Sequence, residues 1–325
     1  MSEDDDAGMP DDQEDDDTAE ELDVEVPRLL DSVRADRAIS MLTGLTRSAS
    51  SALVASGAVQ LDGATLTKGS QVLEAGQRLV ASLPTVGPDV LVAEPDVEVR
   101  VVLEDPEFVV VDKPAGLVVH PGAGHHRGTL VAGLLARYPE LAGLGELEGS
   151  SPMRPGIVQR LDKGTSGVLV VARTPRGFSS LSGQLASRTV ERRYLGMVEG
   201  DVTDDDGVVD APIARSLRTP TKMAVRAGGR PSRTAYHVLR RLDAPPRTLL
   251  ELRLETGRTH QIRVHLAAIG RPIVNDPRYG RRREPRLDEG RVFLHAEVLG
   301  FDHPVSSERV VVRAELPEDL AAILA

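Results

Sequence analysis

Six short segments rich in valine and leucine, bounded by glycine, proline or aspartate, constrain the fold of this chain most. They are typical of buried β-strands and span residues 99–105, 108–114, 166–174, 192–200, 234–242 and 248–256. Several follow one another over turns too short for the helix that joins parallel strands. Helical periodicity is found at residues 130–136, 177–186 and 260–268. We therefore expect an α+β domain with a mixed, largely antiparallel sheet flanked by helices, not a doubly wound parallel sheet.

Composition and pattern predict four parts: a disordered acidic tail at residues 1–26, a small α/β domain at 27–84, a linker at 85–97 and the large domain at 98–325. Like charges in the tail repel one another, and little apolar surface is available to offset the entropy of ordering it. In the small domain the apolar spacing favours two short helices, with Gly57 suited to end the second. The Asp62-Gly63 pair that follows is typical of a hairpin turn.

Charge is distributed unevenly along the chain. The formal net charge is −11, but 14 of the 50 acidic residues lie within the first 25 positions. Residues 151–300 hold 27 lysines and arginines against 16 aspartates and glutamates, so this half of the chain is suited to bind a polyanion. Within this half, residues 215–233 are expected to form a long basic loop or hairpin, and a solvated loop without a ligand is the alternative there.

Composition also excludes several classes of protein. The chain has no cysteine, which excludes disulfide scaffolds, thiolate metal sites and cysteine nucleophiles. No apolar run approaches the ~18 residues that a membrane-spanning helix needs, and the acidic N-terminus is unlike a signal peptide. We therefore expect a cytoplasmic protein with no membrane partner, and a monomer by default.

Asp162 is the first candidate for a chemical role. It lies on a loop rich in glycine, threonine and serine, directly before an apolar strand, with Arg160 two residues earlier and Lys163 beside it. Backbone and hydroxyl donors can hold a carboxylate rigidly on such a loop, and strand ends commonly display catalytic groups. An aspartate next to glycine and threonine is most often an ordinary turn residue, so this motif alone favours the turn interpretation.

A helix at residues 260–268 carries the second candidate. Ile262, Leu266 and Ile269 recur at the spacing of one apolar helix face, and Gly270 is placed to end the helix. Arg263 falls on the neighbouring face, so packing can anchor its helix while its guanidinium points at a fixed partner. That partner could be a carboxylate.

Three aromatic or imidazole side chains admit a structural role. Tyr194 alternates with arginine and leucine in a strand, which suits either a half-buried core position or a stacking platform for a base. His295 and His303 lie among apolar residues, where hydrogen-bonded structural histidines are the default expectation.

Five ordered motifs resemble those of the RluA family of RNA pseudouridine synthases. They cover about residues 98–315 and read FVVVDKPAGLVVHPGAG, RLDKGTSG, ERRYLGMVEG, GRTHQIRVHLAAIGRPIVNDPRYG and FLHAEVLGFDHP. The resemblance implies an enzyme that detaches the base of a uridine in RNA, turns it and rejoins it through C5. It assigns Asp162 as the catalytic carboxylate, Tyr194 as the residue packing on the target base and Arg263 as the ion-pair partner of Asp162. It implies no metal and no nucleotide or other cofactor.

Structured RNA is the partner that this resemblance implies. The target base must leave its stack, and Arg160 is expected either to fill the space that it vacates or to contact a phosphate. Further RNA contacts are expected from Arg193, Arg258 and His260, which lie within the motifs.

The small N-terminal domain resembles the S4 RNA-binding module, through the TRSAS segment, the hairpin and the closing AGQRL. This implies that Arg37, Arg47 and Ser48 lie near phosphates, while a stabilising domain without a ligand is the alternative. An S4 module before this catalytic domain is similar to the RluD-like branch of the family. We therefore expect uridines in 23S large-subunit rRNA as the substrate, with tRNA as an open alternative.

Two other classes of protein compete with this interpretation. One is a non-catalytic RNA-binding ribosome-assembly factor, against which the intact Asp162, Tyr194 and Arg263 speak. The other is a glycoside hydrolase, which would need a second carboxylate at a suitable spacing, and no such pair stands out.

Two positions depart from the family's usual motifs. Gln159 stands where the family usually has histidine, and we expect activity to survive because glutamine still donates a hydrogen bond. Asn275 stands where glycine is usual, and asparagine tolerates left-handed backbone angles better than most residues.

Overall fold

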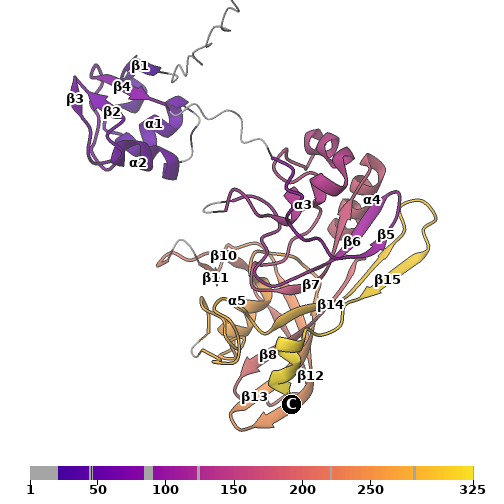
Figure 1. The fold of residues 1–325 in the computed structure, drawn as a ribbon. Coiled ribbons are helices and arrows are strands. Elements are labelled where there is room, and N and C mark those ends of the chain that lie inside the picture. The colour runs from indigo at the N-terminus through magenta and orange to yellow at the C-terminus, as the bar shows by residue number, and fades with distance from the viewer. Residues whose placement is uncertain are drawn as a thin grey trace, which may run out of the picture. The chain divides into compact units, whose positions relative to one another are not determined.

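The computed structural model describes residues 21–43, 45, 47–83, 91–122, 125–219, 222–280 and 283–324. Contacts within the chain separate it into two units, residues 1–89 and 90–325, which are described one at a time (Figure 1).

The first unit is a small sheet with two helices. Its strands pair antiparallel in the order β1-β4-β2-β3, with bounds β1 Glu21–Glu25, β2 Val59–Leu61, β3 Ala64–Thr65 and β4 Arg78–Ser82. Helices α1 (Ala35–Thr43) and α2 (Arg47–Ala55) follow a short 3₁₀ turn at Arg28–Leu30. Buried Ile39, Val54 and Leu79 join helices and sheet in one core.

The predicted hairpin of this unit is confirmed. Leu61 pairs with Ala64, and the two residues between them, Asp62 and Gly63, have φ angles of 51° and 80°. Two consecutive left-handed residues define the turn that matches the twist of the flanking strands. Gly57, at φ 78°, ends α2 as expected.

The prediction of a disordered tail is wrong for its last residues. Glu21–Glu25 forms β1 and pairs with β4. Leu22 and Val24 alternate with acidic residues and pack against the core, so a strand pattern of period two lies hidden in the acidic composition. Residues 1–20 lie outside the described residues.

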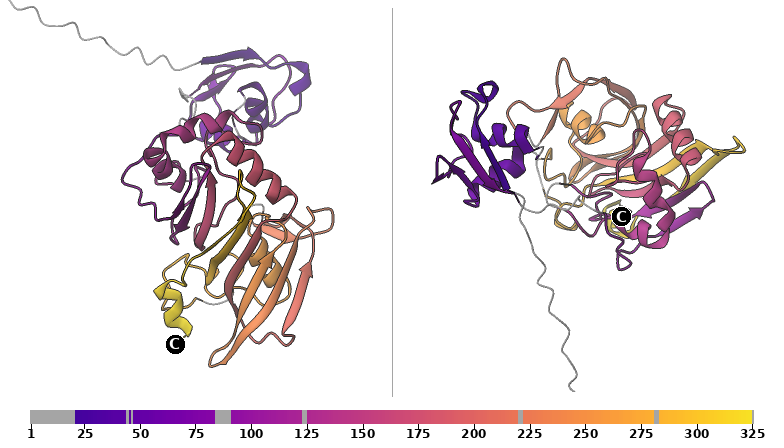
Figure 2. Two further views of the ribbon diagram at one scale, coloured as in Figure 1. Left: turned by 90° about the vertical axis from the view of Figure 1, so that its right-hand side faces the viewer. Right: turned by 90° about the horizontal axis from the view of Figure 1, so that it is seen from above.

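The second unit is built on a nine-stranded sheet. Its strand order is β5-β6-β7-β14-β8-β13-β12-β9, with β15 paired to β14. The bounds are β5 Val101–Glu104, β6 Phe108–Lys113, β7 Ser166–Ala172, β8 Glu191–Glu199, β9 Asp206–Asp210, β12 Arg233–Asp243, β13 Pro246–Leu254, β14 Leu294–Asp302 and β15 Arg309–Arg313. Figure 2 shows the long orange strands β12 and β13 side by side.

This topology confirms the predicted α+β class. The pairing of β7 with β14 is parallel, and the other pairings in the sheet are antiparallel. The six predicted segments are β5, β6, β7, β8, β12 and β13. The sequence did not single out β9, β14 or β15. Basic residues 215–233 were expected to form a loop or hairpin, and β10 (Ile213–Arg215) and β11 (Met223–Val225) form a hairpin there.

The helices lie against both faces of this sheet. They are α3 Leu130–Arg137, a 3₁₀ segment at Pro139–Glu146, α4 Pro175–Ala186, α5 Gln261–Ala268 and α6 Glu318–Leu324. The three predicted helices are confirmed. Val109 and Val111 of β6 face one core cluster while Phe108 and Val110 face another, so this strand is buried on both sides and reads as a continuous apolar run.

Two expectations need correction. Ile269 was expected on the apolar face of α5, but α5 ends at Ala268 and Ile269 is exposed. The linker prediction is also wrong at its C-terminal end. Residues 91–97 belong to the second unit, where the Glu94 amide donates to the Ala132 carbonyl and Val97 packs on Gly133.

None of the helices in the described ranges is both long and apolar enough to cross a membrane.

Candidate active site

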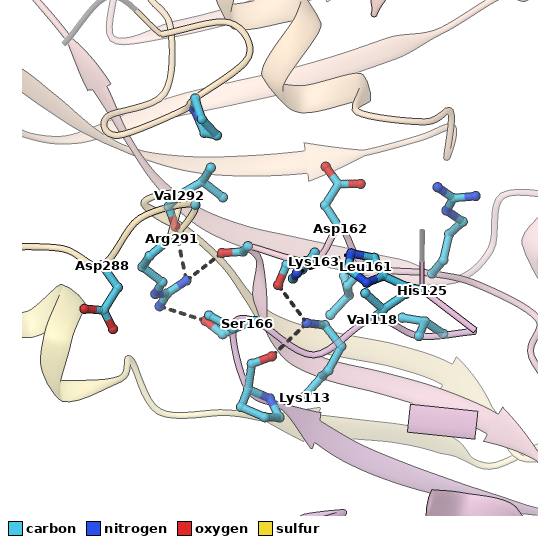
Figure 3. A pocket seen from close by; sticks show the side chains of 18 of the residues that line it. Lys113, Val118, His125, Leu161, Asp162, Lys163, Ser166, Asp288, Arg291 and Val292 are labelled. Carbon is cyan, nitrogen blue, oxygen red and sulfur yellow. Dashed lines mark hydrogen bonds between the residues drawn. The ribbon is translucent and has the colours of Figure 1, made fainter. Parts of the chain in front are cut away.

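Asp162 lies on a loop that leads into β7 and is held by the buried cation Lys113. The Lys113 ammonium donates to the carbonyls of Pro114 and Leu117 at 2.7 and 2.9 Å. It lies 3.5 Å from the carbonyl of Lys163, on the loop that carries Asp162. Figure 3 shows this ammonium beneath the loop, with the Asp162 carboxylate pointing away from it. Burial lowers the pKa of Lys113 to about 7, while the negative charge of Asp162 opposes that shift. Three carbonyl acceptors suit the three N–H bonds of the charged form.

Arg291 holds the same loop from the other side (Figure 3). It donates to the Gly164 carbonyl and the Ser166 hydroxyl, both at 3.0 Å, and pairs with Asp319 at 2.6 Å. A Cβ at Gly164 would lie 2.0 Å from the Gly290 carbonyl oxygen, so glycine is required there. The loop that carries Asp162 is therefore fixed by bonds to its backbone carbonyls and to the Ser166 hydroxyl that follows it.

The expected ion pair between Arg263 and Asp162 is present. Ile262 and Leu266 bury one face of α5, and Arg263 projects from the neighbouring face to bring Nη1 within 2.8 Å of Asp162 Oδ2. Burial works against the charged form of Arg263, but Asp276 and Asp162 together raise its pKa above the ordinary value. The guanidinium thus remains charged where it holds Asp162.

Asp276 is the residue of this network that sequence reasoning missed. It accepts from Nε and Nη2 of Arg263 at 2.7 and 2.9 Å, a bidentate pair. Burial alone would raise the pKa of Asp276, but hydrogen bonds from Arg263 and from the amides of Arg278 and Tyr279 lower it below the ordinary value. Its place inside the motif NDPRYG was the available signal.

Of the two motif departures, the structure accommodates Asn275. Asn275 has a φ of 61°, which asparagine tolerates, and its amide nitrogen donates to the carbonyls of Asp288 and Arg291 at 3.0 and 2.7 Å. Its own oxygen accepts from the Glu284 amide. Gln159 lies at the edge of a cleft beside Asp162.

His260 links Asp162 to Tyr279. It has a left-handed φ of 56°, and its Nε2 lies 3.9 Å from Asp162 Oδ1. Its Nδ1 is 2.9 Å from the Tyr279 hydroxyl, which accepts from the Met223 amide of β11 at 3.0 Å. Burial lowers the pKa of His260, although Asp162 opposes this shift. The hairpin β10–β11 is therefore joined to the surroundings of Asp162 through two side chains.

A buried polar network fixes the start of α5. Gln261 Nε2 donates to Thr234 at 3.0 Å, and Gln261 Oε1 accepts from Thr256 at 2.7 Å. His265 is 2.9 Å from both the Thr234 hydroxyl and the Ala211 carbonyl. Because the carbonyl can only accept, Nε2 of His265 carries a hydrogen. These bonds tie α5 to β12, so Arg263 has a fixed base.

Tyr194 lies beside Asp162 as the motif predicts. A hollow of about 50 Å³ is lined by Tyr194 and Asp162 together with Leu254, Ile262 and Leu294. Burial raises the pKa of Tyr194 to about 12, so the phenol is neutral at physiological pH. Arg160, Arg258, Arg263 and His260 line it as well, so the hollow offers an apolar wall for a planar base among charged and polar groups that include the Asp162 carboxylate.

Two clefts meet at Asp162. The larger has a volume of about 1140 Å³ and the smaller about 370 Å³. Asp162, Arg160 and His120 line both, and Arg258 lines the smaller one. The described residues hold no cluster of three or more side chains that could bind a metal ion.

Of the other residues predicted to bind RNA, one belongs to the second unit and three belong to the first unit. Arg193 pairs with Glu251 at 3.1 Å and with Glu191 at 3.2 Å, and it does not line either cleft. Arg37 and Arg47 are exposed on the first unit. Ser48 is in α2 of that unit, and its side chain lies outside the described part of the structure.

The structural role expected for two histidines is confirmed. His295 is fully buried and is bonded to the Ser166 hydroxyl at 2.9 Å and the Ala314 carbonyl at 3.2 Å. His303 lies 3.2 Å from Asp105.

Comparisons with known proteins identify the family of the chain. Residues 107–268 match the RNA pseudouridylate synthase family. An uncharacterised RNA pseudouridine synthase of Bacillus subtilis is 43% identical over 81% of this chain and 85% of its own length. Ribosomal large subunit pseudouridine synthase D of Nitrosomonas europaea is 41% identical over 93% of this chain and 87% of its own length.

A solved structure shares the fold. Human RNA pseudouridylate synthase domain containing 1 superposes with a TM-score of 0.54 at 28% identity, over 68% of this chain and 84% of that one. With relatives above 40% identity across most of the chain, the protein belongs to the RNA pseudouridylate synthase family, in its RluA branch, and is an RNA pseudouridine synthase.

Proposed function

We propose that this enzyme isomerises uridines in structured large-subunit rRNA, with Asp162 as the catalytic carboxylate. The observation that carries the proposal is the position of Asp162, fixed by Arg263 where two clefts meet and beside the hollow at Tyr194. The relative from Nitrosomonas europaea named for the ribosomal large subunit matches nearly the whole chain, which favours rRNA as the substrate. An rRNA substrate would place the enzyme in the cytoplasm.

The reaction needs one bond broken and one formed at the same sugar carbon. The N1–C1′ bond of the uridine breaks, the uracil turns in the hollow, and a C5–C1′ bond forms. The C5 hydrogen then leaves as a proton and N1 takes up a proton, so atoms and electrons balance without an oxidant. Asp162 acts on the sugar–base linkage, and Arg263 keeps that carboxylate oriented throughout.

The hollow at Tyr194 can retain the base while it is detached. The Tyr194 ring stacks on the uracil. Base–aromatic stacking is worth about 1–3 kcal/mol, so it offsets part of the free energy of a few kcal/mol that flipping the base costs. Arg160 is exposed and lines both clefts, so it is placed to fill the gap in the stem or to contact a phosphate.

The first unit is proposed to add RNA contacts as an S4-like module. Arg37 is exposed on α1, and the guanidinium of Arg47, also exposed, lies 3.6 Å from Asp36. Both can reach phosphates, and Ser48 of α2 stays a predicted phosphate contact.

Tritium release tests the proposal. Transcripts of 23S rRNA and of tRNA, each labelled at uridine C5, are incubated with the purified full chain, and tritium in water is counted. We expect release from the rRNA transcript and little from the tRNA. Release from tRNA alone would show that tRNA, and not rRNA, is the substrate. Binding without any tritium release would favour a non-catalytic assembly factor.

Mapping pseudouridines in total RNA then identifies the positions. RNA from cells lacking the protein should lose modification at specific large-subunit sites and regain it when the gene is restored.

A further inference from the structure

The smaller cleft beside Asp162 holds positive charge that the described part of the chain does not neutralise. Arginines 154, 160, 192 and 258 line it, and Asp162 is its only carboxylate among the described residues. Asp162 already pairs with Arg263, and among the described residues no ion pair joins any of the four arginines to an acidic side chain. Like charges gathered in one hollow repel one another unless an anion joins them.

Arg192 is the most unusual of the four. Its side chain is buried, with 8% of its surface exposed, and it extends from β8 on the same face as Tyr194. Its Nη2 donates to the carbonyls of Leu254 and Glu255 at 3.3 Å, whereas its Nε is buried without a hydrogen-bond partner in the described structure. Burial lowers the pKa of this guanidinium, and only the Tyr194 hydroxyl opposes the shift. A buried cation without an anionic partner destabilises a free protein.

The walls of the cleft favour an anion over any other occupant. Gly257 has no side chain where a Cβ would lie 2.9 Å from Arg192 Nη1, so the approach to the guanidinium is open on that side. Arg258 is half-buried, and burial and its neighbours Arg230 and Arg188 lower its pKa. His120 has a buried Nδ1 with no partner in the described structure, and burial with nearby Arg160 and Arg154 lowers its pKa.

We propose, on the basis of the proposed function, that the smaller cleft is a subsite for an RNA phosphodiester next to the target nucleotide, with Arg192 as its central contact. A backbone phosphate beside the flipped nucleotide must lie within a few ångströms of the base in the Tyr194 hollow, and Arg192 and Tyr194 line this cleft together. A guanidinium fork matches two phosphate oxygens, and Arg258 and Arg154 supply further charge at the rim.

Arg193 is the matched control for this subsite. It is the next residue along β8 and has the same side chain, but it points to the opposite face and pairs with Glu251. Sequence alone selected Arg193 for RNA contact, whereas the structure places Arg192 in the cleft. One strand therefore offers a paired and an unpaired arginine for comparison.

The test measures RNA affinity against salt concentration for the full chain and three variants. The probe is a stem-loop transcript of 23S rRNA, bound without counting turnover. Arg192→Met should lose affinity and reduce the slope of log affinity against log salt by about 1, which is the loss of one phosphate contact. Arg193→Met should leave the slope unchanged, and Arg192→Lys should keep most of it because the charge remains.

Thermal unfolding of the RNA-free chain gives the second readout. Arg192→Met should raise Tm or leave it unchanged, because an unpaired buried charge is removed, whereas Arg193→Met should lower Tm because Glu251 loses a partner. If Arg192→Met lowers Tm and leaves the salt slope intact, the side chain is structural and the proposal is overturned. If Arg192→Met does not fold at all, the same conclusion follows.

Inorganic phosphate separates the possible sources of the anion. A rise in the Tm of the wild-type chain with phosphate at constant ionic strength, together with an unchanged RNA slope in Arg192→Met, would assign the cleft to a free anion and overturn the RNA subsite. The slope does not depend on isomerisation, so failure of this subsite and failure of the proposed function are distinguished by salt titration and tritium release.

Discussion

Two buried arginines near Tyr194 differ in how their charge is balanced. Arg263 donates to two carboxylates, Asp162 and Asp276, through three of its nitrogens. Arg192 donates only to backbone carbonyls and, within the described residues, pairs with no acidic side chain. The first arrangement is complete without a ligand and orients a reactive group. The second is completed only by an anion from outside, so the two arginines separate catalytic orientation from substrate binding.

Replacing Arg263 should have the largest effect on the charge-balanced network that it forms with Asp162 and Asp276. Arg263→Met leaves Asp276, whose side chain is fully buried, without its bidentate partner, and leaves Asp162 unoriented. We expect isomerisation to be lost and the free energy of unfolding to fall by about 3–5 kcal/mol. Urea unfolding and tritium release measure both effects. An unchanged unfolding free energy would contradict the buried network.

Asp276→Asn should weaken the same network but leave it in place. The variant keeps the shape and one acceptor but loses the charge that raises the pKa of Arg263. We expect kcat to fall roughly tenfold or more while RNA affinity is retained, since Asp276 lines neither cleft. Single-turnover rates and filter binding check the split. Equal losses in kcat and affinity would place Asp276 in binding instead.

Lys113 is a third buried basic residue, and its effect on stability should depend on pH. Burial lowers its pKa from 10.5 to about 7, so between these values the unfolded chain binds more protons than the native chain. Because of this residue, the free energy of unfolding therefore rises with pH through that window, by at most about 1.4 kcal/mol per pH unit. Below about pH 6 the residue causes no such rise.

Urea titrations at pH 6 to 10 compare wild type with Lys113→Met. The difference in unfolding free energy between them should grow in favour of the wild type above pH 7. Parallel pH profiles would mean that the three carbonyl acceptors keep the native pKa near its unfolded value.

The smallest effect is expected from Tyr279→Phe. It removes only the hydroxyl that joins the Met223 amide to His260, and keeps the ring that packs beside Arg263. We expect kcat to fall several-fold with Tm nearly unchanged. Tyr236→Phe, a change of the same kind on β12, serves as the control. Equal kcat values for the two variants would show that this link does not affect Asp162.

Much of the fold follows from local pattern. The valine runs of β6 and β7, the Asp62-Gly63 turn and the period of α5 each carry a signal within a few residues. Strand β1 was not predicted, because the acidic residues of this segment outweigh Leu22 and Val24 in its composition. Strands β9, β14 and β15 depend on pairing with distant partners, which local propensity does not encode.

The site divides in the same way. Helix spacing predicted that Arg263 could point at a fixed partner, and the resemblance of the motifs supplied Asp162 as that partner and Tyr194 as the residue packing on the base. Asp276 and Lys113 lie inside quoted motifs, but their partners were not predicted because their contacts form where separate segments meet in the folded chain. The choice between Arg192 and Arg193 depends on strand register, since a shift of one residue exchanges the two faces of β8.

Single-turnover isomerisation by Asp162→Asn tests the central claim most directly. Arg263 keeps Asp276 in this variant, so the chain should fold and bind the 23S transcript with nearly wild-type affinity. The account predicts no tritium release from C5-labelled uridine under these conditions. Release at the wild-type rate by the folded, RNA-bound variant would contradict it.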